Sequence, residues 1–145
     1  MIDITKKKEI LRIASASGRI TLKEATIKRI QNRDVKKGDV FTISKIAGIN
    51  AVKKVPDLIP LCHPIPITKV DIQFEIETDT SIKVICIVKS FARTGVEMEA
   101  LTGVSTALLN IWDIVKMYEK DDNGQYPDTI IEEIKVEEKI KEPNY

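Results

Sequence analysis

The strongest periodic pattern in this sequence lies between residues 95 and 120. Apolar side chains recur there every three or four positions, at Leu101, Val104, Leu108, Ile111 and Val115. This spacing places them on one face of an α-helix, the face that a folded protein buries. The pattern therefore predicts one long helix, and it constrains the fold more than any other feature of the chain.

Two neighbouring segments predict a β-hairpin. Residues 68–77 alternate between apolar and polar side chains, as in a half-buried antiparallel strand. After a turn-forming Thr-Asp-Thr at 78–80, residues 82–88 are nearly continuously apolar and β-branched, as in a central strand. Alternation also predicts a first strand within residues 10–22 and a closing strand at residues 130–140.

The order of these elements predicts the fold class. Residues 23–30 could form a short helix, and residues 40–54 carry apolar side chains at helical spacing. The chain then follows the split βαβ pattern of an α+β ferredoxin-like fold, an antiparallel four-stranded sheet with helices packed on one face. At 145 residues we expect a single domain, 1–145. Ile85 and Ile87 would lie on the uncovered face of the sheet and are too apolar for water, which predicts a homo-oligomer.

Composition excludes several classes of function. No run approaches the roughly 20 apolar residues of a membrane helix, and the N-terminus lacks the apolar core of a secretory signal, so we expect a soluble cytoplasmic protein without a membrane partner. The 23 Lys and Arg residues balance 22 Asp and Glu residues, which argues against a nucleic-acid partner. Cys62 and Cys86 are the only cysteines, too few for a disulfide framework.

The long helix carries a second, polar stripe beside its apolar one. This stripe consists of Glu99, Thr102, Thr106, Asn110, Asp113 and Lys116 or Met117. It could simply be a solvated face, but threonine and asparagine replace the Glu-Lys pairs that water-facing helices prefer, which suits a pocket wall. Asp113 and Lys116, three residues apart, could form an ordinary surface ion pair or an acid/base pair.

The two ends of the polar stripe cannot contact one small substrate. Glu99 and Asp113 are fourteen residues apart, or about 21 Å along the axis at ~1.5 Å per residue. If both ends are functional, each site combines one end of this helix with the opposite end of the helix from a neighbouring subunit. The sequence therefore predicts sites at a subunit interface.

A proline-stiffened loop at residues 57–64 holds the only histidine, His63. It could be a buried turn with an incidental histidine. A zinc site is poorly supported because one His and two Cys lack the usual spacing of ligand pairs. A Cys-His nucleophile pair is also weakly supported, since the adjacent Cys62 and His63 point in opposite directions on extended chain. We expect no metal ion.

Basic residues offer candidate anion sites, with solvated surface charge as the alternative for each. Lys37 precedes Gly38 at a predicted helix N-terminus, where backbone N–H groups already favour anions. Arg12 and Lys53 lie in two further basic positions. Neither the glycine-rich phosphate loop nor the dinucleotide fingerprint is present, so side chains would have to hold a nucleotide-like substrate.

Four motifs together resemble the cyclic pyranopterin monophosphate synthase family, the C protein of molybdenum cofactor biosynthesis. They are Lys-Gly-Asp-Val-Phe at 37–41, Ile-Ala-Gly-Ile at 46–49, Leu-Ile-Pro-Leu-Cys-His-Pro at 58–64 and Gly-Val-Glu-Met-Glu-Ala-Leu-Thr at 95–102. The resemblance extends from Asp3 to about Lys120. It implies a lyase that converts (8S)-3′,8-cyclo-7,8-dihydroguanosine 5′-triphosphate into cyclic pyranopterin monophosphate and diphosphate. It also implies a ferredoxin-like homohexamer, a trimer of dimers, that uses no cofactor and has sites between subunits.

The resemblance assigns roles by position. Asp113 matches the catalytic acid/base, with Lys37 and Lys116 as the catalytic lysines. Five residues match substrate-contacting stretches, namely Leu61, Cys62, His63, Met98 and Glu99. Arg12 and Lys53 match basic residues expected at the triphosphate, whose roughly four negative charges need several cations.

The chain departs from many bacterial members after Lys120. Those members carry a glycine- and lysine-rich loop where this chain has Asp-Asp-Asn-Gly-Gln-Tyr-Pro-Asp at 121–128, as in the archaeal branch of the family. The aspartates would oppose any phosphate contact from this loop. The alternative function is a ferredoxin-like nucleotide-sensing module without turnover, which would have no need of a base such as Asp113 beside an anion site.

Overall fold

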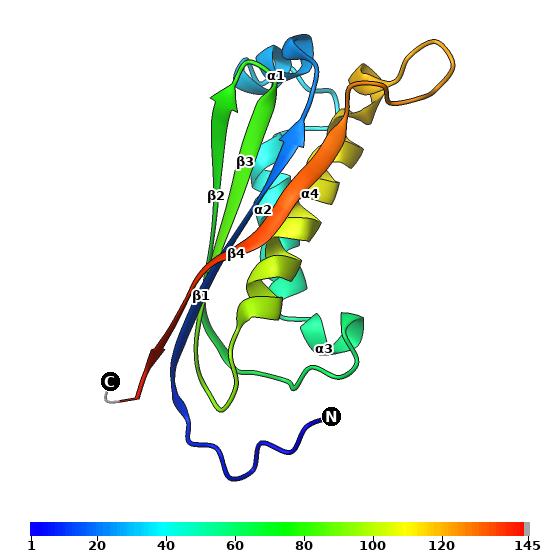
Figure 1. The fold of residues 1–145 in the computed structure, drawn as a ribbon. Coiled ribbons are helices and arrows are strands. Elements are labelled where there is room, and N and C mark those ends of the chain that lie inside the picture. The colour runs from blue at the N-terminus through cyan, green and yellow to red at the C-terminus, as the bar shows by residue number, and fades with distance from the viewer. Residues whose placement is uncertain (144–145) are drawn as a thin grey trace.

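The computed structural model describes residues 1–143 and has one sheet with helices over one of its faces (Figure 1). Among these residues the strands are β1 (Ile10–Thr21), β2 (Ile67–Thr78), β3 (Ser81–Ala92) and β4 (Ile130–Glu142). The helices are α1 (Glu24–Gln31), α2 (Val40–Val52), α3 (Val55–Leu58) and α4 (Glu97–Glu119). The strand order is β2-β3-β1-β4, with every neighbouring pair antiparallel. The predicted α+β ferredoxin-like fold is therefore confirmed.

The apolar stripe of α4 forms the centre of the core. Val104, Leu108, Ile111 and Val115 are all fully buried, as their spacing predicted. Helix α4 packs on β1, β3 and β4, while α2 packs on β2 and beside α4. Gly18 of β1 permits the close approach, because a methyl group added there would lie 2.8 Å from Leu108 Cδ1.

A buried carboxylate joins three elements at the C-terminal end of α4. Glu119 has no exposed surface, and its oxygens accept hydrogen bonds from the Thr26 hydroxyl, the Thr129 hydroxyl at 2.7 Å and the Lys23 backbone N–H at 3.2 Å. Such charge-assisted bonds compensate the cost of burying the carboxylate. They fix the beginnings of α1 and β4 against α4.

The structure differs from the sequence prediction at α3. The motif at 57–64 was predicted to be a loop throughout, but Asp57 and Leu58 form the last two residues of this four-residue helix. Pro56 lies in its first turn, a position where proline, without an N–H, costs no helical hydrogen bond. The remaining predicted elements are all present, and their bounds differ from the prediction by up to four residues.

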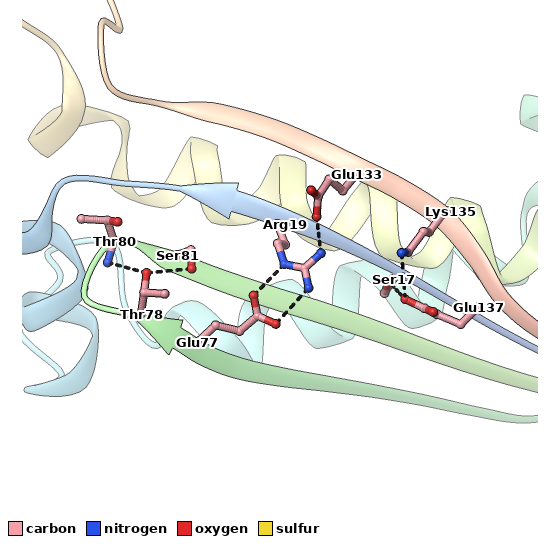
Figure 2. Close-up of polar contacts among 9 residues, drawn as sticks. All are labelled: Ser17, Arg19, Glu77, Thr78, Thr80, Ser81, Glu133, Lys135 and Glu137. Carbon is pink, nitrogen blue, oxygen red and sulfur yellow. Dashed lines mark hydrogen bonds and ion pairs between the residues drawn. The ribbon is translucent and has the colours of Figure 1, made fainter.

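Charged side chains line one part of the uncovered sheet face (Figure 2). Arg19 of β1 pairs with Glu77 of β2 at 2.6 Å and with Glu133 of β4, so one guanidinium joins three strands. Ile85 and Ile87, predicted to lie on this face, are half-buried. Burial of this face in an oligomer therefore stays a prediction. No helix within residues 1–143 combines the length and apolar character that crossing a membrane requires.

Candidate active site

A cavity of about 500 Å³ lies at the N-terminal end of α4. The 57–64 motif contributes Leu61, Cys62 and His63, and the first turn of α4 contributes Met98 and Glu99. The N-terminal segment and the residues just before α4 complete the wall, with Met1, Ile2, Ile4, Lys7, Ile65, Thr94, Gly95 and Glu97. The structure thus brings together five of the predicted substrate-contacting residues.

Glu99 is a buried carboxylate in this cavity. Only 3% of its surface is exposed, and burial, reinforced by the nearby charge of Glu97, raises the pKa of its carboxyl group. Within residues 1–143 no lysine, arginine or histidine forms a salt bridge with it. Burial of a carboxylate without a cation is unfavourable, so this end of α4 favours a positively charged neighbour.

Glu97, two residues before Glu99 in the wall of the same cavity, has a partner. It forms an ion pair with Lys139 of β4. Burial would raise the pKa of Glu97, but the hydrogen bond from Lys139, together with the more distant Arg12, holds it below its ordinary value. Arg12 itself is buried, and its guanidinium donates to the backbone oxygens of Ala92 at 3.4 Å and Arg93 at 3.2 Å.

The opposite end of α4 carries a carboxylate between two lysines. Asp113 accepts from Lys116 at 3.0 Å and from Lys37 at 3.3 Å, and Lys37 also donates to the Asp113 backbone oxygen at 2.8 Å. The hydrogen bond from Lys116 and then that from Lys37 hold the pKa of Asp113 below its ordinary value of 3.8. The carboxylate therefore stays ionised at neutral pH.

An open hollow of about 420 Å³ adjoins this charged cluster. Its other walls are apolar or aromatic, with Leu109, Trp112, Tyr126 and Ile131 beside Asp113 and Lys116. Trp112 and Tyr126 meet edge to face, with ring centroids 5.2 Å apart. The hollow can accept a flat organic group next to the ionised carboxylate.

The predicted site residues therefore form two groups, one at each end of α4. Lys53 belongs to neither, since it caps the C-terminus of α2 with its side chain exposed. Arg12 also lines neither cavity, since its buried guanidinium donates to backbone oxygens of β3 and of the residue after it. Three participants were not singled out from the sequence as site residues, namely Glu97, Tyr126 and Lys139. The alternating charges of residues 130–140 did not single out Lys139 as a site residue. Its contact with Glu97 at the start of α4 depends on how β4 pairs with β1.

Neither a Cys62–His63 nucleophile pair nor a zinc site gains support from the structure. Burial and the charge of Glu99 raise the pKa of the Cys62 thiol, which disfavours the thiolate that a nucleophile requires. In the part of the chain that the structure describes, no three His, Cys, Asp or Glu side chains gather as a metal site would require. That the protein works without a metal stays a prediction.

Comparison with known proteins decides the family. The MoaC family model matches residues 1–141 of this chain. The chain belongs to the MoaC family. It is 57% identical to a protein of Archaeoglobus fulgidus over 141 residues, covering 97% of this chain and 90% of that protein, and 58% identical to one of Pyrococcus furiosus, covering 98% and 90%. A relative from Sulfurisphaera tokodaii is 55% identical over 97% of this chain and 93% of its own length.

Each of these three MoaC relatives is named a probable cyclic pyranopterin monophosphate synthase. The family is thus one of enzymes, and this member is an enzyme. A sensing module without turnover, the alternative that the sequence left open, is not what these relatives are.

Proposed function

We propose that this MoaC protein makes cyclic pyranopterin monophosphate in molybdenum cofactor biosynthesis. Its substrate would be (8S)-3′,8-cyclo-7,8-dihydroguanosine 5′-triphosphate, and its second product diphosphate. The observation that carries the proposal is the identity of 55–58% to relatives bearing the synthase name, over nearly the whole chain. One domain spanning residues 1–145 would perform the reaction in the cytoplasm, without nucleic acid.

Asp113 is proposed as the proton-transfer group. Forming the cyclic phosphate requires a hydroxyl oxygen of the ribose-derived part to bond to the α-phosphorus, while the bond from that phosphorus to the diphosphate oxygen breaks. The hydroxyl proton passes to a base, and an ionised carboxylate such as Asp113 can accept it. Lys37 and Lys116, which both pair with Asp113, would neutralise charge on the departing diphosphate and return protons.

The group around Glu99 is proposed to hold the rest of the substrate. His63, Cys62 and Leu61 would contact it from the 57–64 motif, and Met98 from α4. Arg12 and Lys53 are proposed to act at the triphosphate, although both lie outside the two pockets within one chain. Lys53 would have to serve a site on a neighbouring subunit.

Two features favour assembly of each site from two subunits. The two ends of α4 are complementary, since Glu99 at one end is buried without an ion pair among residues 1–143 and the other end has two lysines around a single carboxylate. The helical layer also exposes apolar side chains, including Leu109 at 61% and Ile46 at 55%. A two-fold axis that sets two α4 helices antiparallel would join opposite ends twice, and three such dimers would give the proposed hexamer.

Diphosphate release tests the proposed reaction. Purified enzyme supplied with the cyclic triphosphate should release one diphosphate per substrate, together with a pterin product detectable by its absorbance. Asp113→Asn and Lys37→Ala should each lower kcat by about 100-fold or more, the usual scale for removing a general acid or base. Lys28→Ala, which alters an exposed i,i+4 pair on α1, is the control. Absence of release by the unaltered enzyme would refute the proposed reaction, whereas near-normal turnover of both variants would refute only the roles.

A further inference from the structure

Tyr118 connects the catalytic helix to the segment that carries Lys37. Tyr118 lies on α4 five residues after Asp113, about 7.5 Å further along the axis at ~1.5 Å per residue. Its hydroxyl oxygen accepts a hydrogen bond of 2.9 Å from the backbone N–H of Lys36. Helix α4 thus carries Asp113 and also binds the backbone of Lys36, the residue before Lys37, through the Tyr118 hydroxyl.

The ring of Tyr118 is held in turn by Arg29 of α1. The guanidinium carbon lies 4.5 Å from the ring centroid, a cation–π contact. Arg29 also pairs with Asp34 at 3.0 Å, and the Asp34 backbone N–H donates to the Arg29 oxygen at 2.9 Å. These contacts fix both the ring and the beginning of the segment that follows α1.

One other hydrogen bond holds the backbone around Lys37 within the segment from residue 32 to 39: the Gly38 N–H donates to the Val35 oxygen at 3.1 Å and closes a turn over residues 36 and 37. Val35 is its one buried side chain, whereas the side chains of Lys36 and Lys37 are exposed. The backbone of Gly38 has a φ angle of 123°, a conformation that a residue with a side chain rarely adopts. Because burial holds neither lysine, the direction of Lys37 depends on its backbone. The turn from Val35 to Gly38 sets the shape of that backbone, and the bond from Lys36 to Tyr118 ties the turn to α4.

We propose that Tyr118 is a positioning residue, whose hydroxyl holds the 36–37 backbone so that the Lys37 ammonium reaches both oxygens of Asp113, the carboxylate and the backbone carbonyl. This inference deepens the proposed function, and only the expected effect on kcat rests on that function. The claim that Tyr118 holds Lys37 against Asp113 concerns the structure alone and does not depend on the substrate. Tyr118→Phe is the sharpest variant, because it removes the hydroxyl and leaves the ring for Arg29.

The first test follows the side-chain carboxyl of Asp113 by ¹³C NMR, with Asp113→Asn for assignment. The charged and titratable groups beside it are Lys37, Lys116 and, across the hollow, Tyr126. Loss of the Lys37 contact removes one of the two cations that favour the carboxylate, so Tyr118→Phe should raise the pKa of Asp113 part of the way toward 3.8. Thr78→Val is the matched control, since it removes another hydroxyl that accepts a backbone N–H, from Thr80 at 3.2 Å in the β2–β3 turn.

The second test is kinetic. Tyr118→Phe should lower kcat by about 3- to 10-fold, the scale of one lost hydrogen bond, with KM little changed. In the Lys37→Ala background the same substitution should have almost no further effect, because there is no ammonium left to position. An equal loss in both backgrounds, or a pKa of Asp113 that Tyr118→Phe does not move, would overturn the inference. Full activity of Lys37→Ala would instead refute the catalytic role of Lys37, and the NMR result would still decide whether Tyr118 positions it.

Discussion

At the scale of single residues, four carboxylates on or beside α4 differ only in their surroundings. Glu99 is buried without a cation and its pKa is raised, while Asp113 between two lysines has a lowered pKa. Glu97 is paired with Lys139, and Glu119 is buried among three donors. In these surroundings Glu99 is suited to bind a cation and Asp113 to act as a base. Glu97 instead holds β4 against α4, and Glu119 joins α1 and β4 to the end of α4.

Glu119 provides the stability prediction at this scale. Glu119→Ala would leave two buried hydroxyls and the Lys23 N–H without their acceptor, and should lower the free energy of unfolding by about 3 kcal/mol or more. Glu119→Gln should cost less, because its amide oxygen still accepts one or two of these bonds. Urea denaturation followed by circular dichroism measures both. Glu138→Ala, an exposed carboxylate on β4, should change stability by less than about 0.5 kcal/mol, and an equal loss there would refute the prediction.

At the scale of elements, the sequence predicted what depends on local periodicity. The apolar stripe of α4 and the alternation of residues 68–77 determine those elements directly, since each pattern has only one face to bury. It could not predict that Lys139 meets Glu97, because this contact depends on register shifts between β1 and β4. The motif at 57–64 supplies three of the residues that line the cavity, although local pattern missed the single turn of α3.

The crossing of α2 and α4 gives a prediction about packing. A methyl group at Gly103 would lie 2.7 Å from Cys86 Sγ and 2.9 Å from Val52 Cγ2, so no substituent fits without movement of the core. Gly103→Ala should therefore destabilise the protein by about 1–3 kcal/mol, despite the ~1 kcal/mol that alanine contributes to helix propensity. Thermal unfolding measures the change. Lys45→Ala on the exposed face of α2 is the control, and a Gly103→Ala protein that is more stable than the parent would contradict the packing argument.

At the scale of the whole molecule, the predicted site residues lie at opposite ends of α4. Within residues 1–143 Glu99 forms no ion pair, although Lys7 lines the same cavity, and the hollow beside Asp113 is open to one side. The sequence predicted their separation from helix length alone, because fourteen residues of α-helix exceed the span of one small substrate; that each site combines ends from two subunits stays a prediction. Which residues join each half followed only from the tertiary structure, as Tyr126 and Lys139 demonstrate.

Subunit exchange tests whether opposite ends of α4 meet. Glu99→Ala and Asp113→Ala chains should each be inactive alone, since every site would lose one group. In a mixed dimer one site combines both intact ends and the other combines both altered ends. Equal amounts after full exchange therefore regain about one quarter of the activity of the unaltered enzyme, because half of the dimers are mixed and half of their sites are intact.

A second mixture with the same number of altered residues gives the matched control. Chains carrying both substitutions, mixed equally with unaltered chains, place one altered end in every site of a mixed dimer. Activity should then fall from about one half of the unaltered value to about one quarter as exchange proceeds. If each site lay within one chain, the first mixture would stay inactive and the second would remain at one half. The two mixtures move in opposite directions only when the sites are shared, so unfolding of an altered chain cannot imitate the result.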